Sequence, residues 1–340
     1  MAFLPYLHRV AARENLTSAQ AREAMSLLLG GDATTVQIAA FLTALKVKGE
    51  TPDEVLGFAQ AMREKAVVID AGAGGEPLID TCGTGGDNSG TFNISTLAAF
   101  VAAGAGVRVA KHGNRSLSSR CGSADLMEAL GVNIALPPER IGACIREVGI
   151  GFLFAPAIHT ATRHAQPARA ELRMRTFFNL LGPLTNPAGA TAQLAGAPSR
   201  SAAELMAEVL ARLGLERSFV VHGDDGLDEI TTTAPTFVLE ITRGAIANHE
   251  WTPEDFGVRR AVARDLKGGD PAANREIALA VLSGAEGPRR DIVLVNAAAA
   301  LIVAGKAASQ AQAMAVAAQS VDSGAAKRKL DQLIAFTQAA

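Results

Sequence analysis

A glycine-rich loop is the first stretch of this 340-residue chain whose residue types could do chemistry. It runs from Asp80 to Thr96, between an apolar strand predicted at 78–81 and a helix predicted at 97–103. Glycines let backbone N–H groups approach a phosphate, and a helix N-terminus adds free donors and partial positive charge. The loop fits neither common nucleotide-binding pattern, because position 88 is Asn and no Gly-Lys-Ser/Thr follows. A simple tight turn is the alternative, and Asp87 beside a phosphate would need a metal or a sugar hydroxyl between them.

A second loop, residues 111–125, follows a strand predicted at 107–110 and is rich in cations and hydroxyls. It contains Lys111, Arg115 and Arg120, three serines, and a further serine, Ser123, at the start of a predicted helix. Such donors with almost no competing acceptor charge suit a phosphate or pyrophosphate. The alternative is a solvated basic loop in which Ser123 is an ordinary N-cap.

The third loop is an acidic turn after a strand predicted at 218–221. Its adjacent carboxylates, Asp228 and Glu229, can hold one or two hard cations through oxygen and leave other positions to water and phosphates, as magnesium prefers. An isolated acidic pair is more often simply exposed. The two loops suited to phosphate favour the metal-binding interpretation here.

Two arginines upstream of that turn, Arg169 and Arg173, lie four residues apart, which predicts that they share one face of a helix. A planar guanidinium is the best side chain for binding a carboxylate at two points. Pairing with Glu171 or exposure to solvent is the commoner fate of such arginines.

The composition excludes several classes of protein. With 49% hydrophobic residues the chain can bury a core, and a formal net charge of −2 gives no global field that would recruit nucleic acid or an anionic membrane. Only 4% of residues are aromatic, which leaves few platforms for stacked bases. The longest uncharged apolar run, residues 292–305, is too short to cross a bilayer and predicts a buried helix.

The cysteines and the first residues bear on the location of the protein. Cys82, Cys121 and Cys144 fit neither a disulfide framework nor a zinc-binding spacing, and reduced thiols favour the cytoplasm. The opening MAFLPYLHRVAAR lacks the basic and sustained apolar regions of an export signal.

The predicted secondary structure that positions the three loops changes near residue 72, from helices alone to alternating strands and helices. Residues 17–68 carry apolar residues at helical spacing, with Thr17 and Thr51-Pro52 as caps, which predicts three short helices and no strands. After the glycine-rich stretch 71–77, strands and helices alternate, with further elements predicted at 151–154 and 201–213. This alternation is typical of an α/β fold, in which ligands bind at the carboxyl ends of the strands.

The assembled segments resemble, in order and over nearly the whole chain, the anthranilate phosphoribosyltransferase family. The segments that carry the resemblance are QIAAFL (37–42), KGET (48–51), GTGGD (83–87), KHGNR (111–115), RTFFNLLGPLTNP (175–187) and GLDE (226–229). The resemblance implies a small all-helical domain, residues 1–72, and an α/β domain, residues 73–340, with a central, mostly parallel sheet of the nucleoside phosphorylase/phosphoribosyltransferase type. Helices from about 166 to 185 would return to the helical domain, and a homodimer would form through the helical parts.

The resemblance also implies the reaction and its site. The enzyme would transfer the phosphoribosyl group of phosphoribosyl pyrophosphate to the amine of anthranilate in tryptophan biosynthesis. Phosphoribosyl pyrophosphate would be held by Gly83, Gly86, Asp87, Thr91, Asn93, Ile94, Ser95, Thr96, Lys111, His112, Gly113, Asn114, Arg115, Ser116, Leu117, Ser118, Ser119 and Ser123. Mg²⁺ would be bound by Ser95, Asp228 and Glu229.

Anthranilate would occupy the other half of the implied site. It would contact Gly83 and Asn114, its carboxylate would meet Arg169, and His112 and His159 would line the path by which it enters. Lys111, Asn114 and Arg169 would act by positioning, since the anthranilate amine is neutral at pH 7 and needs no strong base.

The chain departs from the family pattern near the implied anthranilate path. Ile158 and Thr160 flank His159 where a second histidine and a proline are frequent, and Arg173 stands where glycine is usual. A pyrimidine nucleoside phosphorylase and a DNA-binding relative of the same fold are the rival interpretations. The Asp228-Glu229 turn argues against the first, because phosphorolysis has no pyrophosphate to hold through magnesium, and the net charge argues against the second.

Overall fold

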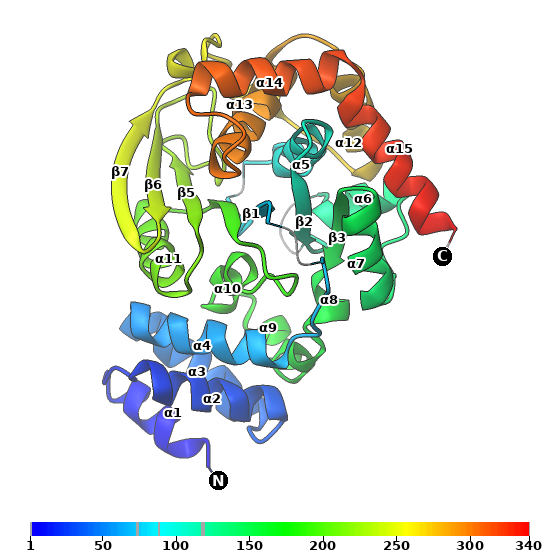
Figure 1. Cartoon of the computed structure of the whole chain (residues 1–340). Coiled ribbons are helices and arrows are strands. Elements are labelled where there is room, and N and C mark those ends of the chain that lie inside the picture. Colours follow the sequence, from blue (N-terminus) through cyan, green and yellow to red (C-terminus); the bar gives the residue numbers. More distant parts are fainter. Residues whose placement is uncertain (1, 73–74, 88, 117–119, 340) are drawn as a thin grey trace.

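The computed structural model describes residues 2–72, 75–87, 89–116 and 120–339, and begins with a small helical part. Helices α1 (Leu4–Ala11), α2 (Ser18–Gly30), α3 (Thr35–Lys48) and α4 (Pro52–Lys65) lie together at one end of the molecule (Figure 1). The three helices predicted within residues 17–68 are confirmed. Helix α1 was not predicted, and its N-cap, Phe3, makes no side-chain capping bond that would have marked its start.

Each of these three helices starts at a threonine that forms a capping box. The Oγ1 atoms of Thr17, Thr34 and Thr51 accept from the N–H three residues later, and a Gln or Glu side chain accepts from each threonine N–H in return. At Thr51 the returning side chain is Glu54, which is fully buried and pairs with Lys48 at 2.9 Å. The caps satisfy the free donors of each helix locally.

The larger part of the chain is built on one seven-stranded sheet within the described residues. Its strands are β1 (Leu78–Gly83), β2 (Arg108–Gly113), β3 (Ile150–Phe154), β4 (Ala192–Gly196), β5 (Arg217–Gly223), β6 (Thr236–Thr242) and β7 (Ala245–Trp251). The order across the sheet is β3-β2-β1-β4-β5-β6-β7. Strands β1 to β5 are parallel, whereas β6 and β7 form an antiparallel hairpin at one edge.

Four of the parallel strands end in glycine at the same edge of the sheet. Gly83 of β1 is in register with Gly196 of β4, while Gly113 and Gly223 close β2 and β5. The chain order reverses between β1 and β4, and such a switch point is where an α/β sheet opens a crevice for ligands. The three loops singled out in the sequence all leave from this edge.

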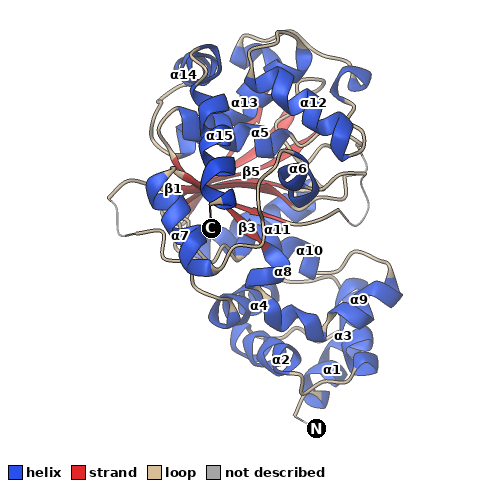
Figure 2. Ribbon diagram, turned by 90° about the vertical axis from the view of Figure 1, so that its right-hand side faces the viewer, coloured by secondary structure: helices blue, strands red, loops and turns tan. Residues whose placement is uncertain are grey.

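Helices cover both faces of the sheet (Figure 2). One face carries α5 (Ile94–Gly104), α13 (Pro288–Val303), α14 (Gln310–Asp322) and α15 (Ala325–Gln338), and the other carries α10 (Phe178–Leu184) and α11 (Arg200–Arg212). Residues 292–303 are all buried in α13, which confirms the predicted buried helix. Among the described residues, no helix combines the length and apolar character needed to cross a membrane.

Shorter elements connect these layers. They are α6 (Ser123–Ala129), α7 (Pro138–Glu147), α8 (Ala155–Ile158), the 3-10 turn η1 (Thr160–His164), α9 (Gln166–Leu172), the 3-10 turns η2 (Pro253–Phe256) and η3 (Ala263–Leu266), and α12 (Pro271–Leu282). Helices α9 and α10 pack against α3 and α4, so residues 166–184 return to the helical part.

The core of the helical part continues into the sheet. Phe41, Phe58 and Phe177 pack ring against ring, and the same buried cluster extends through Leu210 of α11 to Ile241 of β6. The Arg63 side chain adds a hydrogen bond of 2.8 Å to the carbonyl of Leu184. The helical part is therefore stabilised by elements that lie far along the chain.

Candidate functional site

The glycine loop and the acidic turn meet at the carboxyl edge of the sheet. The N–H of Gly85 donates to Oδ2 of Asp228 at 2.7 Å, and the N–H of Ser95 donates to Oε1 of Glu229 at 3.1 Å. Segments about 140 residues apart in the chain thus form one structure, with both carboxylates held against backbone donors. Of the predicted residues, the structure brings Ser95, Asp228 and Glu229 together.

Two glycines make room for Asp228. A Cβ on Gly83 would lie 2.4 Å from Oδ2 of Asp228, and a Cβ on Gly196 would lie 1.7 Å from its backbone carbonyl oxygen. Atoms do not approach so closely. The acidic turn could therefore not pack against the strand ends if position 83 or 196 carried a side chain. The strand-end glycines therefore place the acidic turn, as well as leaving space for a ligand.

The two carboxylates are costly to ionise where they lie. Burial raises the pKa of Asp228, and repulsion from Asp87 raises it further. The pKa of Glu229 is raised by burial and then by Asp228. A divalent cation would offset both effects by its attraction for the carboxylates, and an oxygen-only donor set suits magnesium.

No group of three or more His, Cys, Asp or Glu side chains in the described residues is arranged to hold a metal. A cation bound to Asp228 and Glu229 would complete its coordination with neutral oxygens, such as the Ser95 hydroxyl and water, and with a substrate phosphate, as magnesium does. The residues present fit magnesium on these terms.

A buried lysine closes the floor of the site. Nζ of Lys111, on β2, donates to the carbonyl of Thr81 and lies 3.5 Å from Oγ of Ser95. Next to Ser95 in the chain, the Oγ1 atom of Thr96 is buried and has no hydrogen-bond partner among the described residues. The fixed cation of Lys111, next to the Ser95 hydroxyl, can receive an anionic oxygen.

The second loop is folded back on helix α6. The N–H of Asn114 donates to Oγ of Ser123 at 3.1 Å, and the N–H of Ser116 donates to Asp125 at 3.2 Å. The Arg115 guanidinium forms ion pairs with Asp125 at 3.0 Å and Glu128 at 2.6 Å. In this arrangement its charge is paired with protein carboxylates, so binding a phosphate would require these ion pairs to open. The predicted residues Leu117, Ser118 and Ser119 lie outside the described residues.

A further segment, residues 263–274, borders the glycine loop. This contact was not predicted from the sequence. Nδ2 of Asn274 donates to Oδ1 of Asn93 at 2.9 Å, and Nδ2 of Asn93 donates to the carbonyl of Cys121 at 3.1 Å. Lys267 pairs with Thr91 in an isolated bridge, and its Nζ donates to the carbonyl of Ser89. Nothing in the local sequence around Lys267 or Asn274 marks this contact.

Two histidines form the apolar side of the site. The rings of His112 and His159 have centroids 5.1 Å apart, and Nδ1 of His112 donates to the carbonyl of Gly182 at 3.0 Å. Burial lowers the pKa of His112 and lowers that of His159 to about 3, so both rings are neutral at pH 7. Nε2 of His112 and both ring nitrogens of His159 are buried without a hydrogen-bond partner in the described structure.

The expectation that Arg169 and Arg173 share a helix face is wrong. Helix α9 ends at Leu172, and Arg173 is its C-cap with φ +46°, in the left-handed region where glycine is favoured. Arg169 lies in the last turn, with its guanidinium carbon 4.9 Å from the centre of the Phe178 ring. Burial lowers the pKa of Arg169, and in the described part of the chain its side chain has no hydrogen bond or ion pair.

Another arginine, Arg175, was not predicted as a site residue, although it begins the segment RTFFNLLGPLTNP (175–187) that carries the family resemblance. It belongs to the connection between α9 and α10, and its guanidinium reaches the glycine loop. Its Nη1 donates to the carbonyl of Gly85 at 2.5 Å, and Nη2 lies 3.4 Å from Oγ1 of Thr84. The contact joins residues 90 positions apart, so the local sequence around Arg175 could not predict it.

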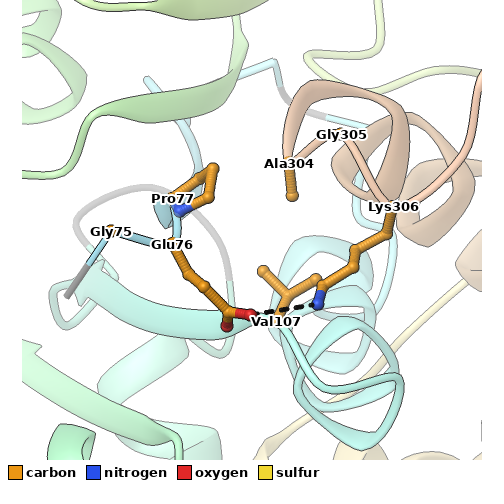
Figure 3. A pocket seen from close by; sticks show the side chains of 7 residues that line it. All are labelled: Gly75, Glu76, Pro77, Val107, Ala304, Gly305 and Lys306. Atoms are coloured by element: carbon orange, nitrogen blue, oxygen red, sulfur yellow. Dashed lines mark ion pairs between the residues drawn. The ribbon is translucent and has the colours of Figure 1, made fainter.

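A separate cavity of about 220 Å³ lies at the opposite edge of the sheet (Figure 3). Its lining consists of residues before β1 and β2 and after α13, namely Gly75, Glu76, Pro77, Val107, Ala304, Gly305 and Lys306. An ion pair of 3.8 Å between Glu76 and Lys306 spans it. The cavity has none of the glycine-loop, histidine or acidic-turn residues, and it is distinct from the site described above.

Two family descriptions match the chain. The glycosyl transferase family, helical bundle domain, matches residues 4–66, and the glycosyl transferase family, a/b domain, matches residues 75–327. Fold and site thus define a glycosyl transferase in which a helical bundle is joined to an α/β domain. The fold class predicted from the sequence is confirmed.

Individual relatives narrow the class. Anthranilate phosphoribosyltransferase from Solibacter usitatus is 61% identical over 336 residues, which cover 99% of each chain. A crystal structure of anthranilate phosphoribosyltransferase from Thermus thermophilus matches with a TM-score of 0.93 and 46% identity, covering 98% of this chain and 99% of that one. The Saccharomyces cerevisiae enzyme in complex with PRPP and Mg matches with a TM-score of 0.92 and 27% identity, covering 100% and 98%. The chain belongs to the anthranilate phosphoribosyltransferase family.

Proposed function

We propose that this chain transfers the phosphoribosyl group of 5-phosphoribosyl 1-pyrophosphate to the amine of anthranilate. The products are N-(5-phosphoribosyl)anthranilate and pyrophosphate, a step of tryptophan biosynthesis. The observation that carries the proposal is the junction of the glycine loop with the acidic turn, where Gly85 and Ser95 hold Asp228 and Glu229. A loop suited to phosphate beside a metal-binding pair fits a substrate that carries pyrophosphate.

Phosphoribosyl pyrophosphate binds, in this proposal, along the carboxyl edge of the sheet. The unsatisfied Oγ1 of Thr96 and the fixed ammonium of Lys111 support anion binding at the start of α5, where the helix N-terminus adds its own donors. The other proposed ligands are Gly83, Gly86, Asp87, Thr91, Asn93, Ile94, Ser95, His112, Gly113, Asn114, Arg115, Ser116, Leu117, Ser118, Ser119 and Ser123. For Arg115 to take part, its ion pairs with Glu128 and Asp125 would have to open.

Magnesium binds to Ser95, Asp228 and Glu229 in this proposal. When bound, it neutralises negative charge that grows on the pyrophosphate as the bond to the anomeric carbon breaks. Asp87, which receives the N–H of Ser89 at 3.1 Å, is close enough to Asp228 to raise the pKa of that carboxyl. A ribose hydroxyl or a metal-bound water between Asp87 and the phosphates would relieve the repulsion between their charges.

Anthranilate binds on the side of the histidine pair. Neutral, buried rings of His112 and His159 suit an aromatic ring, and their unsatisfied nitrogens can meet its amine or a water. The unpaired guanidinium of Arg169 suits the carboxylate of the substrate. Gly83 and Asn114 complete the proposed contacts.

Positioning dominates the proposed mechanism. The amine is already the neutral nucleophile at pH 7, and neither histidine can act as a cationic acid there, because burial lowers both pKa values. Lys111, Asn114 and Arg169 therefore bind and orient, and the ribose passes through oxocarbenium character between the two held substrates.

We also propose that the chain works as a cytoplasmic homodimer. Val36 and Val47 of α3 are 79% and 64% exposed and lie three helical turns apart, hence on one face. This unpartnered apolar face supports association through the helical part. Cys82 and Cys144 are buried without a disulfide in the described structure, which supports a reducing compartment. Light scattering should give twice the chain mass of 35.1 kDa, and Val36→Asp combined with Val47→Asp should give the monomer mass.

Loss of anthranilate fluorescence in the presence of phosphoribosyl pyrophosphate and Mg²⁺ tests the activity. A folded, purified protein that consumes no anthranilate would refute the proposal. Incubation with thymidine and phosphate is the matched control for the rival phosphorylase activity, and release of free base would favour that rival.

A further inference from the structure

Arg175 occupies the outer side of the glycine loop. Nη1 donates to the carbonyl of Gly85, and a Cβ on Gly86 would lie 1.9 Å from the same nitrogen. Gly86 has φ +75°, and the absence of a side chain there lets the guanidinium lie directly on the loop backbone. The arginine thus reaches the part of the loop where a phosphate would meet the backbone donors.

The partners of Arg175 leave its charge available. They are a backbone carbonyl and the hydroxyl of Thr84. Arg175 is near enough to Asp228 to lower the pKa of that carboxyl, but among the described residues no carboxylate lies within ion-pair distance of it. Neutral acceptors use some of the five donors of a guanidinium but do not compensate its charge. This contrasts with Arg115, whose guanidinium is doubly paired with Glu128. A planar guanidinium that forms no ion pair is suited to two phosphate oxygens.

Arg175 is also close in the chain to residues of the proposed anthranilate site. It follows Arg169 by six residues, and Phe178, whose ring lies under the Arg169 guanidinium, comes three residues later. Helix α9 and the connection that follows it therefore carry one arginine each, Arg169 at the proposed anthranilate site and Arg175 at the glycine loop. Neither arginine forms an ion pair with a carboxylate among the described residues.

We propose that Arg175 is a binding residue for the pyrophosphate group, exchanging the Gly85 carbonyl for phosphate oxygens when that group enters the site. The inference rests on the proposed function and adds a ligand from the segment between α9 and α10. Because this connection directly follows the last turn of α9, which carries Arg169, pyrophosphate bound to Arg175 also restrains the backbone next to the proposed anthranilate contact.

Calorimetric titration of the full chain with pyrophosphate and Mg²⁺, without other substrate, tests the proposal. Arg175→Ala and Arg175→Gln should each weaken pyrophosphate binding roughly 10- to 100-fold, because a charge-assisted hydrogen bond is lost. Gln keeps a donor for the Gly85 carbonyl but has no charge. Arg175→Lys should fall between these variants and the unmodified protein.

Arg259→Ala is the matched control, since it removes one exposed arginine elsewhere and should bind pyrophosphate like the unmodified protein. Anthranilate affinity, measured by fluorescence without pyrophosphate, should stay within about two-fold in the Arg175 variants, because the Arg169 contact is separate. Unchanged pyrophosphate affinity in Arg175→Gln would overturn the proposal, and so would equal losses for both ligands. Failure of the unmodified protein to consume anthranilate would instead refute the proposed function.

Discussion

At the scale of single residues, the arginines of this site differ in whether the folded protein pairs them with a carboxylate. Arg115 is paired with two carboxylates, whereas Arg169 lies over a phenylalanine ring and Arg175 on a carbonyl. All three looked alike as cations in the sequence. The structure separates an arginine whose ion pairs must open before it can bind an anion from two that form no ion pair among the described residues.

Arg169→Ala should weaken anthranilate use much more than phosphoribosyl pyrophosphate use. Losing a buried charged contact of about 2 to 3 kcal/mol corresponds to a rise in the KM for anthranilate of roughly 30- to 150-fold. Steady-state kinetics with each substrate varied in turn measures both constants. Arg163→Ala, a neighbouring exposed arginine, is the control, and equal effects of Arg169→Ala on both KM values would argue against the carboxylate contact.

Asp228→Asn combined with Glu229→Gln should abolish the response of turnover to Mg²⁺ together with most activity. In the unmodified protein the pKa values of both carboxyls are raised, so protons compete with the metal, and the half-saturating Mg²⁺ concentration should rise as pH falls. Magnesium titrations at several pH values measure this. Asp224→Asn, which removes a carboxylate paired with Arg200 in the same turn, should retain the response. A double variant that still responds to Mg²⁺ would contradict the assignment.

Local sequence was sufficient to find the residues of the three loops, because each loop is continuous and follows a strand. It could not find Arg175 or Asn274, whose partners lie 90 and 181 residues away. Nor could it show that Arg115 is paired with Glu128, since only the folded loop brings α6 beside it.

At the scale of elements, the glycines at the strand ends decide where the loops lie. Gly196→Ala should destabilise the fold by about 2 to 3 kcal/mol, because the new Cβ would overlap the Asp228 carbonyl, which cannot move without its turn. Chemical denaturation measures the loss, and Mg²⁺-dependent turnover should fall with it.

Gly182→Ala is the matched control for that substitution. Gly182 lies in α10, and a Cβ added there would have no atom within 4 Å, so alanine should leave stability equal or raise it by up to about 1 kcal/mol. A Gly196→Ala protein as stable as Gly182→Ala would show that the acidic turn is not held by this glycine.

The elements that carry clear local signals were predicted from the sequence. Thr17 and Thr51-Pro52 marked helix starts, and the strands at 107–110 and 218–221 were placed within three residues of their observed bounds. The β6–β7 hairpin was missed, since its turn, Arg243-Gly244, puts a non-glycine residue at φ +48°. The end of α9 was misplaced for the same reason, because Arg173 takes a backbone conformation that arginine rarely adopts.

At the scale of the whole molecule, stability should depend on the histidine pair. The pKa of His159 is lowered to about 3, so acid protonates the unfolded chain before the folded one. Stability is therefore complete above the ordinary histidine pKa and is lost as pH falls. Between pH 7 and pH 5 this residue should cost about 2 kcal/mol of unfolding free energy.

Comparing His159→Asn with the unmodified protein at both pH values isolates that contribution, because the fixed cost of the substitution cancels. The variant should lose about 2 kcal/mol less than the unmodified protein on acidification. His8→Asn, which replaces an exposed histidine of α1, is the control and should leave the difference between the two pH values intact. Identical acid sensitivity of all three proteins would contradict the buried neutral ring.

The shared core of the helical part and the sheet has a consequence for synthesis. The first four helices are complete by Lys65, but their buried cluster includes Ile241 of β6, so the last of its partners leaves the ribosome 176 residues later. At 5–20 residues per second, this delay is roughly 10 to 35 s. During that time the apolar faces of the helices remain exposed to solvent. A nascent chain of this kind exposes its N-terminal helices to chaperones for most of its translation, and a fragment ending near residue 72 should aggregate on expression.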